Sequence, residues 1–153
     1  MLLLCAFLVG LVSGLRTFLA PAAVSWFARL AMLPVAATPM AFMGYRYTPI
    51  VFTVLAIAEL ITDTLPSTPS RKVPPQFIAR VVSGALVGAT VGAAAQMLVL
   101  GLVLGILGAV AGTLGGSAVR GKLAAAFHRD LPAALLEDVA AIAIAVCSLL
   151  VLG

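Results

Sequence analysis

Two acids, Glu59 and Asp63, are the residues of this sequence best placed to do chemistry, because they lie inside an otherwise apolar stretch. Four residues apart on a helix, they share one face. Their like charges repel unless a cation lies between them or one carboxyl holds a proton. Arg16, in an earlier apolar stretch, is the matching cation. Burying such charges in a membrane costs roughly 2.5 to 3.5 kcal/mol each, so the three form either a structural ion network or an ion- or substrate-binding site.

A second acidic pair, Glu137 and Asp138, lies early in the last apolar stretch. Adjacent helical residues point about 100° apart, so the two acids have different partners. We expect one to meet Arg80 or Arg120 and the other to reach the membrane interface. A helix start stabilises acids, which favours a structural role for these four charges. Glu59 is therefore predicted to be the functionally sensitive acid.

Three further patterns carry no chemistry. Residues 116–122 match the start of a phosphate-binding loop, but Leu123 stands where a magnesium-binding hydroxyl belongs and no strand precedes it. His128 has no second His or Cys at ligand spacing. No Ser, His and Asp grouping indicates a nucleophile. We predict no catalytic residue, metal or cofactor, and the sequence favours a protein that is not an enzyme.

The elements that must hold these charges follow from the composition. The chain has 153 residues, of which 63% are hydrophobic and 9% charged, against about 25% charged in soluble domains. The apolar residues form long blocks, which predicts an all-α integral membrane protein with about five transmembrane helices in one polytopic domain, residues 1–153. The net charge of +4 is expected to hold loops against lipid headgroups, without nucleic acid as a partner, because no aromatic residues interleave the basic ones.

The first apolar stretch runs to about residue 33 and contains Arg16 and Pro21. We interpret it as a retained first helix rather than a signal peptide, since it lacks a basic start. The helix should end near Ala20 and break near Pro21, leaving carbonyls free inside the bundle. An interfacial or re-entrant segment around Trp26 should follow.

Four more spans complete the prediction. The second runs over about 50–65. The apolar region 76–119 is too long for one span, so it should reverse near residues 95–98. A polar loop is expected at 120–130, and the last span at 131–152.

The basic residues predict the orientation. Six lie in the second and fourth predicted loops and two in the first, which favours an inner-membrane protein with a cytoplasmic N-terminus. The six are Arg71, Lys72, Arg80, Arg120, Lys122 and Arg129, and the two are Arg29 and Arg46.

Glycines recur every four residues in the later spans, which lets helices approach closely. They indicate either tight packing within the chain or faces that slide or bind a partner, including a second copy. We expect the first three to face another helix. They are Gly84, Gly88, Gly92, Gly101, Gly105, Gly108, Gly112 and Gly116.

The two halves of the chain also share a weak pattern. Gly10 and Gly14 precede Arg16 as Gly108 and Gly112 precede Arg120. Each such span leads toward an acidic pair, the arrangement of inverted-repeat transporters.

Four motifs in order resemble a bacterial membrane family catalogued as domain of unknown function 4126. They are the stretch 14–21 around Arg16, the stretch 59–66 with Glu59 and Asp63, Arg80 with Gly84, and residues 135–139 with Glu137 and Asp138. The resemblance covers most of the chain outside residues 30–50. It implies a helical membrane architecture and no established activity.

Three functions are compatible with these features. The first is a small transporter or channel-like protein for an unknown ion or small solute, with Arg16, Glu59 and Asp63 as its polar centre. The second is a structural or accessory membrane subunit, in which the charges lock helices together and the glycine faces bind a partner. The third, least favoured, is an enzyme acting on lipid headgroups.

Overall fold

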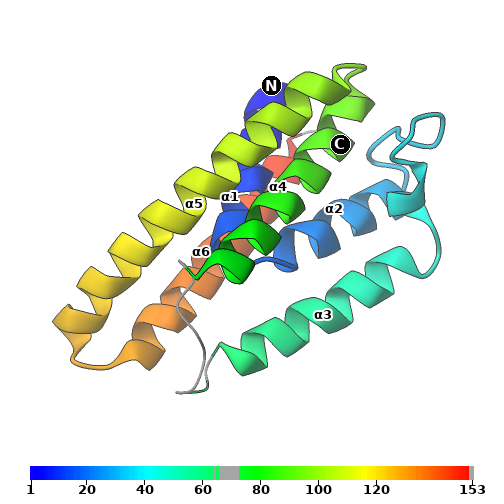
Figure 1. Cartoon of the computed structure of the whole chain (residues 1–153). Coiled ribbons are helices and arrows are strands. Elements are labelled where there is room, and N and C mark those ends of the chain that lie inside the picture. Colours follow the sequence, from blue (N-terminus) through cyan, green and yellow to red (C-terminus); the bar gives the residue numbers. More distant parts are fainter. Residues whose placement is uncertain (64, 66–72, 152–153) are drawn as a thin grey trace.

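The computed structural model describes residues 1–63, 65 and 73–151. Within them the secondary structure is entirely helical (Figure 1). The elements are α1 (Leu2–Leu15), α2 (Leu19–Arg29), the short 3-10 helix η1 (Ala41–Gly44), α3 (Thr48–Thr62), α4 (Pro74–Ala94), α5 (Leu98–Phe127) and α6 (Asp130–Leu150).

The first apolar stretch is broken, but earlier than predicted. α1 ends at Leu15, and Arg16 has an extended backbone with φ −138° and ψ 118°. Pro21 lies in the first turn of α2, where its missing N–H removes no helical hydrogen bond. The expectation that Pro21 ends the first helix is therefore wrong, because a proline in a first turn starts a helix. The segment expected around Trp26 is α2 itself.

The chain reverses at residues 95–97, inside the predicted range. The α4 end is closed by hydrogen bonds from the Met97 N–H to the Gly92 carbonyl (2.8 Å) and from the Gln96 N–H to the Ala93 carbonyl (3.0 Å). Gln96 has a φ of +57°, the left-handed conformation that this capping motif requires.

α5 continues to Phe127, so most of the loop predicted at 120–130 is helix. The sequence around Lys122 is polar enough to suggest a loop, yet it consists largely of strong helix formers. The true connection to α6 is His128 and Arg129, and His128 has a φ of +52°.

Glycines bring α5 against two helices at once. A Cβ added at Gly88 on α4 would overlap the carbonyl oxygen of Gly101 and lie 2.6 Å from the Cα of Gly105. A Cβ at Gly10 on α1 would lie 2.7 Å from the same Gly105 Cα. The prediction that the α4 glycines face a helix closely is confirmed. These faces serve packing within one chain, including those at Gly84, Gly92, Gly108 and Gly112.

These contacts also fix the directions of the helices. Gly10 meets Gly105, and Gly14 meets Gly112, so α1 runs parallel to α5. The N-terminus therefore lies at the end of the bundle where α5 begins, and Figure 1 shows the end of α6 there too. Lys122 lies toward the opposite end, which we call the basic end, with Arg129 in the connection that follows.

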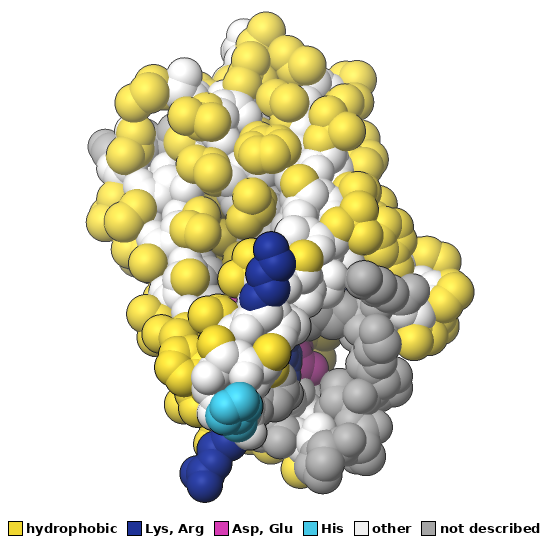
Figure 2. All heavy atoms as spheres, turned by 90° about the vertical axis from the view of Figure 1, so that its left-hand side faces the viewer, with side chains coloured by type: hydrophobic (Ala, Val, Ile, Leu, Met, Phe, Trp, Pro, Cys, Tyr) yellow, Lys and Arg dark blue, Asp and Glu magenta, His cyan; other side chains and the backbone are white. Residues whose placement is uncertain are grey.

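Among the described residues, three helices are long and apolar enough to cross a membrane: α4, α5 and residues Leu131–Leu150 of α6. α1 and α3 are apolar but have only 14 and 15 residues. Figure 2 shows hydrophobic side chains over most of one face, with basic ones between its middle and its lower edge. The described part of the chain thus has three long candidate spans and two shorter apolar helices.

α3 lies to one side of the bundle and packs mainly on α2 (Figure 1). Its link to α2 includes a hydrogen bond from the Trp26 indole to the Thr53 hydroxyl, at 2.9 Å. Most of its apolar side chains are exposed, among them Val54 and Ile61. Glu59 of α3 and Asp63, just past its end, point inward.

Candidate functional site

The gap between α1 and α2 places two helix ends in the interior, and the first is closed by Arg80. One guanidinium nitrogen, Nη1, donates hydrogen bonds to the carbonyl oxygens of Gly14 (2.9 Å) and Leu15 (2.7 Å). Arg80 is only 1% exposed. The carbonyl end of a helix carries partial negative charge, so a cation there is stabilising. The carbonyls expected to be free are thus satisfied.

Glu59 closes the second end. Its Oε1 accepts a hydrogen bond from the Thr17 N–H at 2.7 Å, and its Oε2 accepts one from the Phe18 N–H at 2.9 Å. Both oxygens act as acceptors, which is the hydrogen-bonding pattern of an ionised carboxylate. Nη2 of Arg80 lies 3.8 Å from Oε1. The two residues therefore neutralise opposite helix ends and each other.

Arg16, inside the gap, joins two further helices. Its Nε donates to Oδ1 of Asp138 on α6 at 2.6 Å, and its Nη1 forms an ion pair with Asp63. The predicted contact between Arg16 and one of the acids Glu59 and Asp63 is confirmed, since Arg16 pairs with Asp63. Arg16 is fully buried, whereas the side chains of Asp63 and Asp138 are 10% and 14% exposed.

The two acids of α6 have different partners, as their spacing predicts. Glu137 lies 3.7 Å from Arg120, one of its two expected partners. The expectation that the other acid reaches the interface is wrong, because Asp138 binds Arg16. The sequence could not reveal this, since Arg16 and Asp138 are 122 residues apart.

Three buried hydroxyls complete the polar centre and were missed by sequence reasoning. Ser83 donates to the Thr17 carbonyl and lies 3.3 Å from the Ser13 hydroxyl. Thr113 of α5 lies 3.2 Å from the Gly14 carbonyl, while it also donates to the Ala109 carbonyl. The available signal was the occurrence of Ser and Thr beside glycines in apolar helices.

We call Arg16, Glu59, Asp63, Arg80 and Asp138 the charge network. Among the described residues it combines two guanidinium groups with three carboxylates, a formal charge of −1. Arg80 is six residues into α4 and Asp138 eight residues into α6, so the network lies about 9 to 12 Å from the basic ends of these helices. In the described part of the chain, no three His, Cys, Asp or Glu are grouped to hold a metal ion.

No protein-family model, curated protein or solved structure matches this chain. The class of protein is therefore inferred from the fold: the secondary structure of the described residues is all helical, and three of their helices are long and apolar enough to indicate a membrane protein. A broken helix and an internal charge network define its candidate site.

Proposed function

We propose that the protein is a small membrane transporter that binds a proton or small cation at the charge network. The observation that carries this proposal is the meeting of Asp63 and Asp138 at the single guanidinium of Arg16. One positive charge faces two carboxylates in a buried setting. A proton or monovalent cation would balance the second carboxylate, and its arrival or departure would change how α3 and α6 are held together.

The broken helix supports the same proposal. Secondary transporters place discontinuous helices at their binding sites, with half-helix ends directed at the ligand or its partners. Here the break lies beside Thr113, near the middle of the 30-residue helix α5. Ionisable residues at such depth are costly and are functional candidates by default.

We also propose an orientation that differs from the one expected from five full spans. α1 and α2 form a hairpin, so that the N-terminus and the segment after α2 share one side. The basic end, with Lys122 and Arg129, then lies in the cytoplasm by the positive-inside rule. This places both termini on the outer side of a bacterial inner membrane.

Membership of the family catalogued as domain of unknown function 4126 remains a proposal. It is supported by where the resembling motifs lie in the fold, because every residue of the charge network comes from one of them. These residues are Arg16, Glu59, Asp63, Arg80 and Asp138.

A structural or accessory role is the second candidate. It is favoured by the pairing of each of the four described interior acids with an arginine and by the capping of both helix ends at the break. In that case the network would only hold four helices in register.

Reconstitution in liposomes separates the two candidates. Purified protein is incorporated into vesicles loaded with a dye sensitive to H⁺, Na⁺ or K⁺, and a gradient of the matching cation is imposed in each of three separate arms. The transporter proposal predicts flux above that of protein-free vesicles in at least one arm. Folded protein that carries none of the three cations would overturn it in favour of the structural role.

A further inference from the structure

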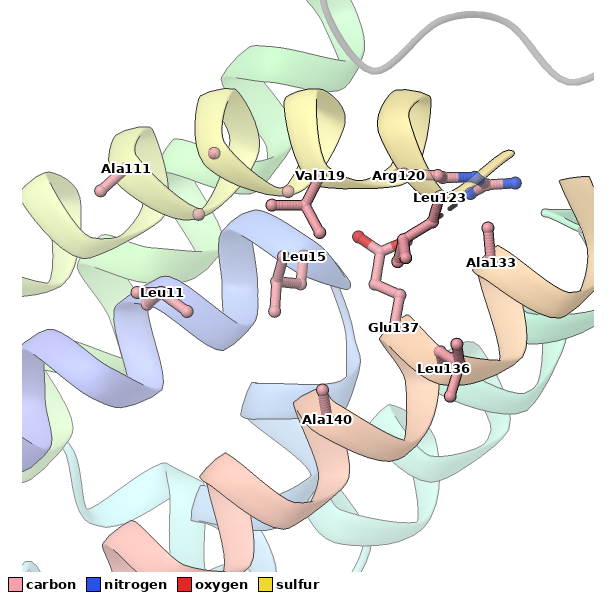
Figure 3. Close-up of a pocket in the computed structure, with 13 residues that line it drawn as sticks. Leu11, Leu15, Ala111, Val119, Arg120, Leu123, Ala133, Leu136, Glu137 and Ala140 are labelled. Atoms are coloured by element: carbon pink, nitrogen blue, oxygen red, sulfur yellow. Dashed lines mark ion pairs between the residues drawn. The ribbon is translucent and has the colours of Figure 1, made fainter. Parts of the chain in front are cut away.

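A cavity of about 450 Å³ lies between α1, α5 and α6, beside the charge network (Figure 3). Its walls are largely apolar and include Leu11 and Leu15 of α1, Ala111 and Gly115 of α5, and Leu136 of α6. Small-molecule sites span roughly 300 to 1,000 Å³ and are mostly apolar, with a few polar groups that orient the ligand. The cavity meets that description.

The cavity exists because α1 stops partway along α5. Up to Gly112 the two helices touch, since a Cβ there would overlap the Leu11 carbonyl. About one helical turn further along α5, at Gly115, a Cβ would meet nothing within 4 Å. With α1 ending at Leu15, α5 and α6 continue toward the basic end without a third helix between them.

An ion pair lines the basic end of this cavity. Arg120 of α5 and Glu137 of α6 lie 3.7 Å apart, and their side chains are 18% and 8% exposed. Figure 3 shows Glu137 reaching from α6 toward α5, with the pair beside the apolar leucines. Arg120 directly follows the apolar run of α5, so the pair is placed where an apolar interior would give way to headgroups.

We propose that the cavity binds one acyl chain of a zwitterionic phospholipid with a primary ammonium headgroup. The chain fills the apolar part, the lipid phosphate faces Arg120, and the ammonium faces Glu137. Opposite charges side by side complement a headgroup that itself carries both signs. An anionic ligand would meet repulsion from Glu137, and a cationic one from Arg120. This site is separate from the proposed cation site and does not depend on it.

Photolabelling tests the position. Full-length protein in nanodiscs receives a phosphatidylethanolamine with a photoactivatable group at the end of one acyl chain, and labelled residues are mapped by mass spectrometry. We expect labels around Leu11, Ala111 and Ala140, which line the end of the cavity away from Arg120. Gly115→Leu adds a side chain to the cavity wall at a position where a Cβ meets nothing within 4 Å, and it should lower this labelling about tenfold or more. Gly121→Leu is the matched control, because a Cβ there also meets nothing within 4 Å and the residue lies outside the cavity.

A second variant and a headgroup series complete the test. Ala140→Leu narrows the cavity from the α6 side and should also reduce labelling. Excess unlabelled phosphatidylethanolamine should compete better than phosphatidylglycerol, and Glu137→Gln should remove that preference. Equal labelling of wild type and Gly115→Leu would overturn the site. Stronger competition by phosphatidylglycerol, or equal competition by a free fatty acid, would overturn the zwitterionic headgroup.

Discussion

Arg80 and Glu59 lie 3.8 Å apart, and each caps one end of the same broken helix. Arg80 holds the carbonyls that end α1, and Glu59 holds the N–H groups that precede α2. Partial charges of opposite sign at helix ends favour these partners. The break is therefore stabilised by side chains from α4 and α3, which explains how an open backbone segment is tolerated in an apolar bundle.

Replacing Glu59 should destabilise the fold. Glu59→Gln keeps one acceptor but loses the charge opposite Arg80, and we expect a loss of about 3 kcal/mol in the free energy of unfolding. Unfolding in a detergent titration measures this loss. The control is a double-mutant cycle with Arg80→Gln. The double variant should lose less stability than the sum of the losses in the two single variants. Additive losses would show that the two caps act independently.

Glycine at 88 should be irreplaceable even by alanine. A single methyl group would overlap the Gly101 carbonyl, and we expect Gly88→Ala to lose about 2 kcal/mol of stability. Gly115→Ala serves as the control on the neighbouring helix. It enters open space and should be neutral or gain up to about 1 kcal/mol from helix propensity. The packing account fails if both variants behave alike in the same titration.

The turn between α4 and α5 can be improved. Gln96 is exposed and has a φ of +57°, which costs a residue with a side chain about 1 kcal/mol relative to glycine. Gln96→Gly should therefore raise stability by about that amount. Ala95→Gly, at the preceding residue with a φ of −94°, should instead lower it. Thermal unfolding in detergent distinguishes the two signs, and a loss at both positions would contradict the conformational argument.

The N-terminus discriminates between the two orientations. If α1 and α2 form a hairpin, a tag before Leu2 should react with a membrane-impermeant reagent added to intact spheroplasts. A cysteine replacing exposed Lys122 should react only after lysis, and the native Cys5 and Cys147 are first replaced. Protection of the N-terminal tag until lysis would restore the orientation expected from five full spans.

Much of this architecture was predictable because apolar length and glycine spacing act locally. The reversal near Gln96 and the contact face of Gly88 both follow from short stretches of sequence. The helix boundary near Pro21 was misjudged because proline can end or begin a helix, and only tertiary contacts decide which.

The charge network was predictable only in part. Arg16 needed an acid, and Asp63 was a clear candidate. The role of Asp138 depends on how α6 is rotated against α1, which no local pattern specifies. The capping by Arg80 and Glu59 could not be predicted from the sequence either, because such a prediction requires knowing where the first helix breaks.

The central claim is that the second carboxylate at Arg16 binds a proton or cation, and one comparison of adjacent acids tests it most directly. Cation flux is measured in liposomes for wild type, Asp138→Asn and Glu137→Gln, each at equal incorporation and with normal folding. Asp138→Asn leaves one carboxylate for Arg16, removes the excess charge and should abolish flux, whereas Glu137→Gln lies outside the network and should retain it. Unchanged flux in Asp138→Asn, with loss in Glu137→Gln, would contradict the claim.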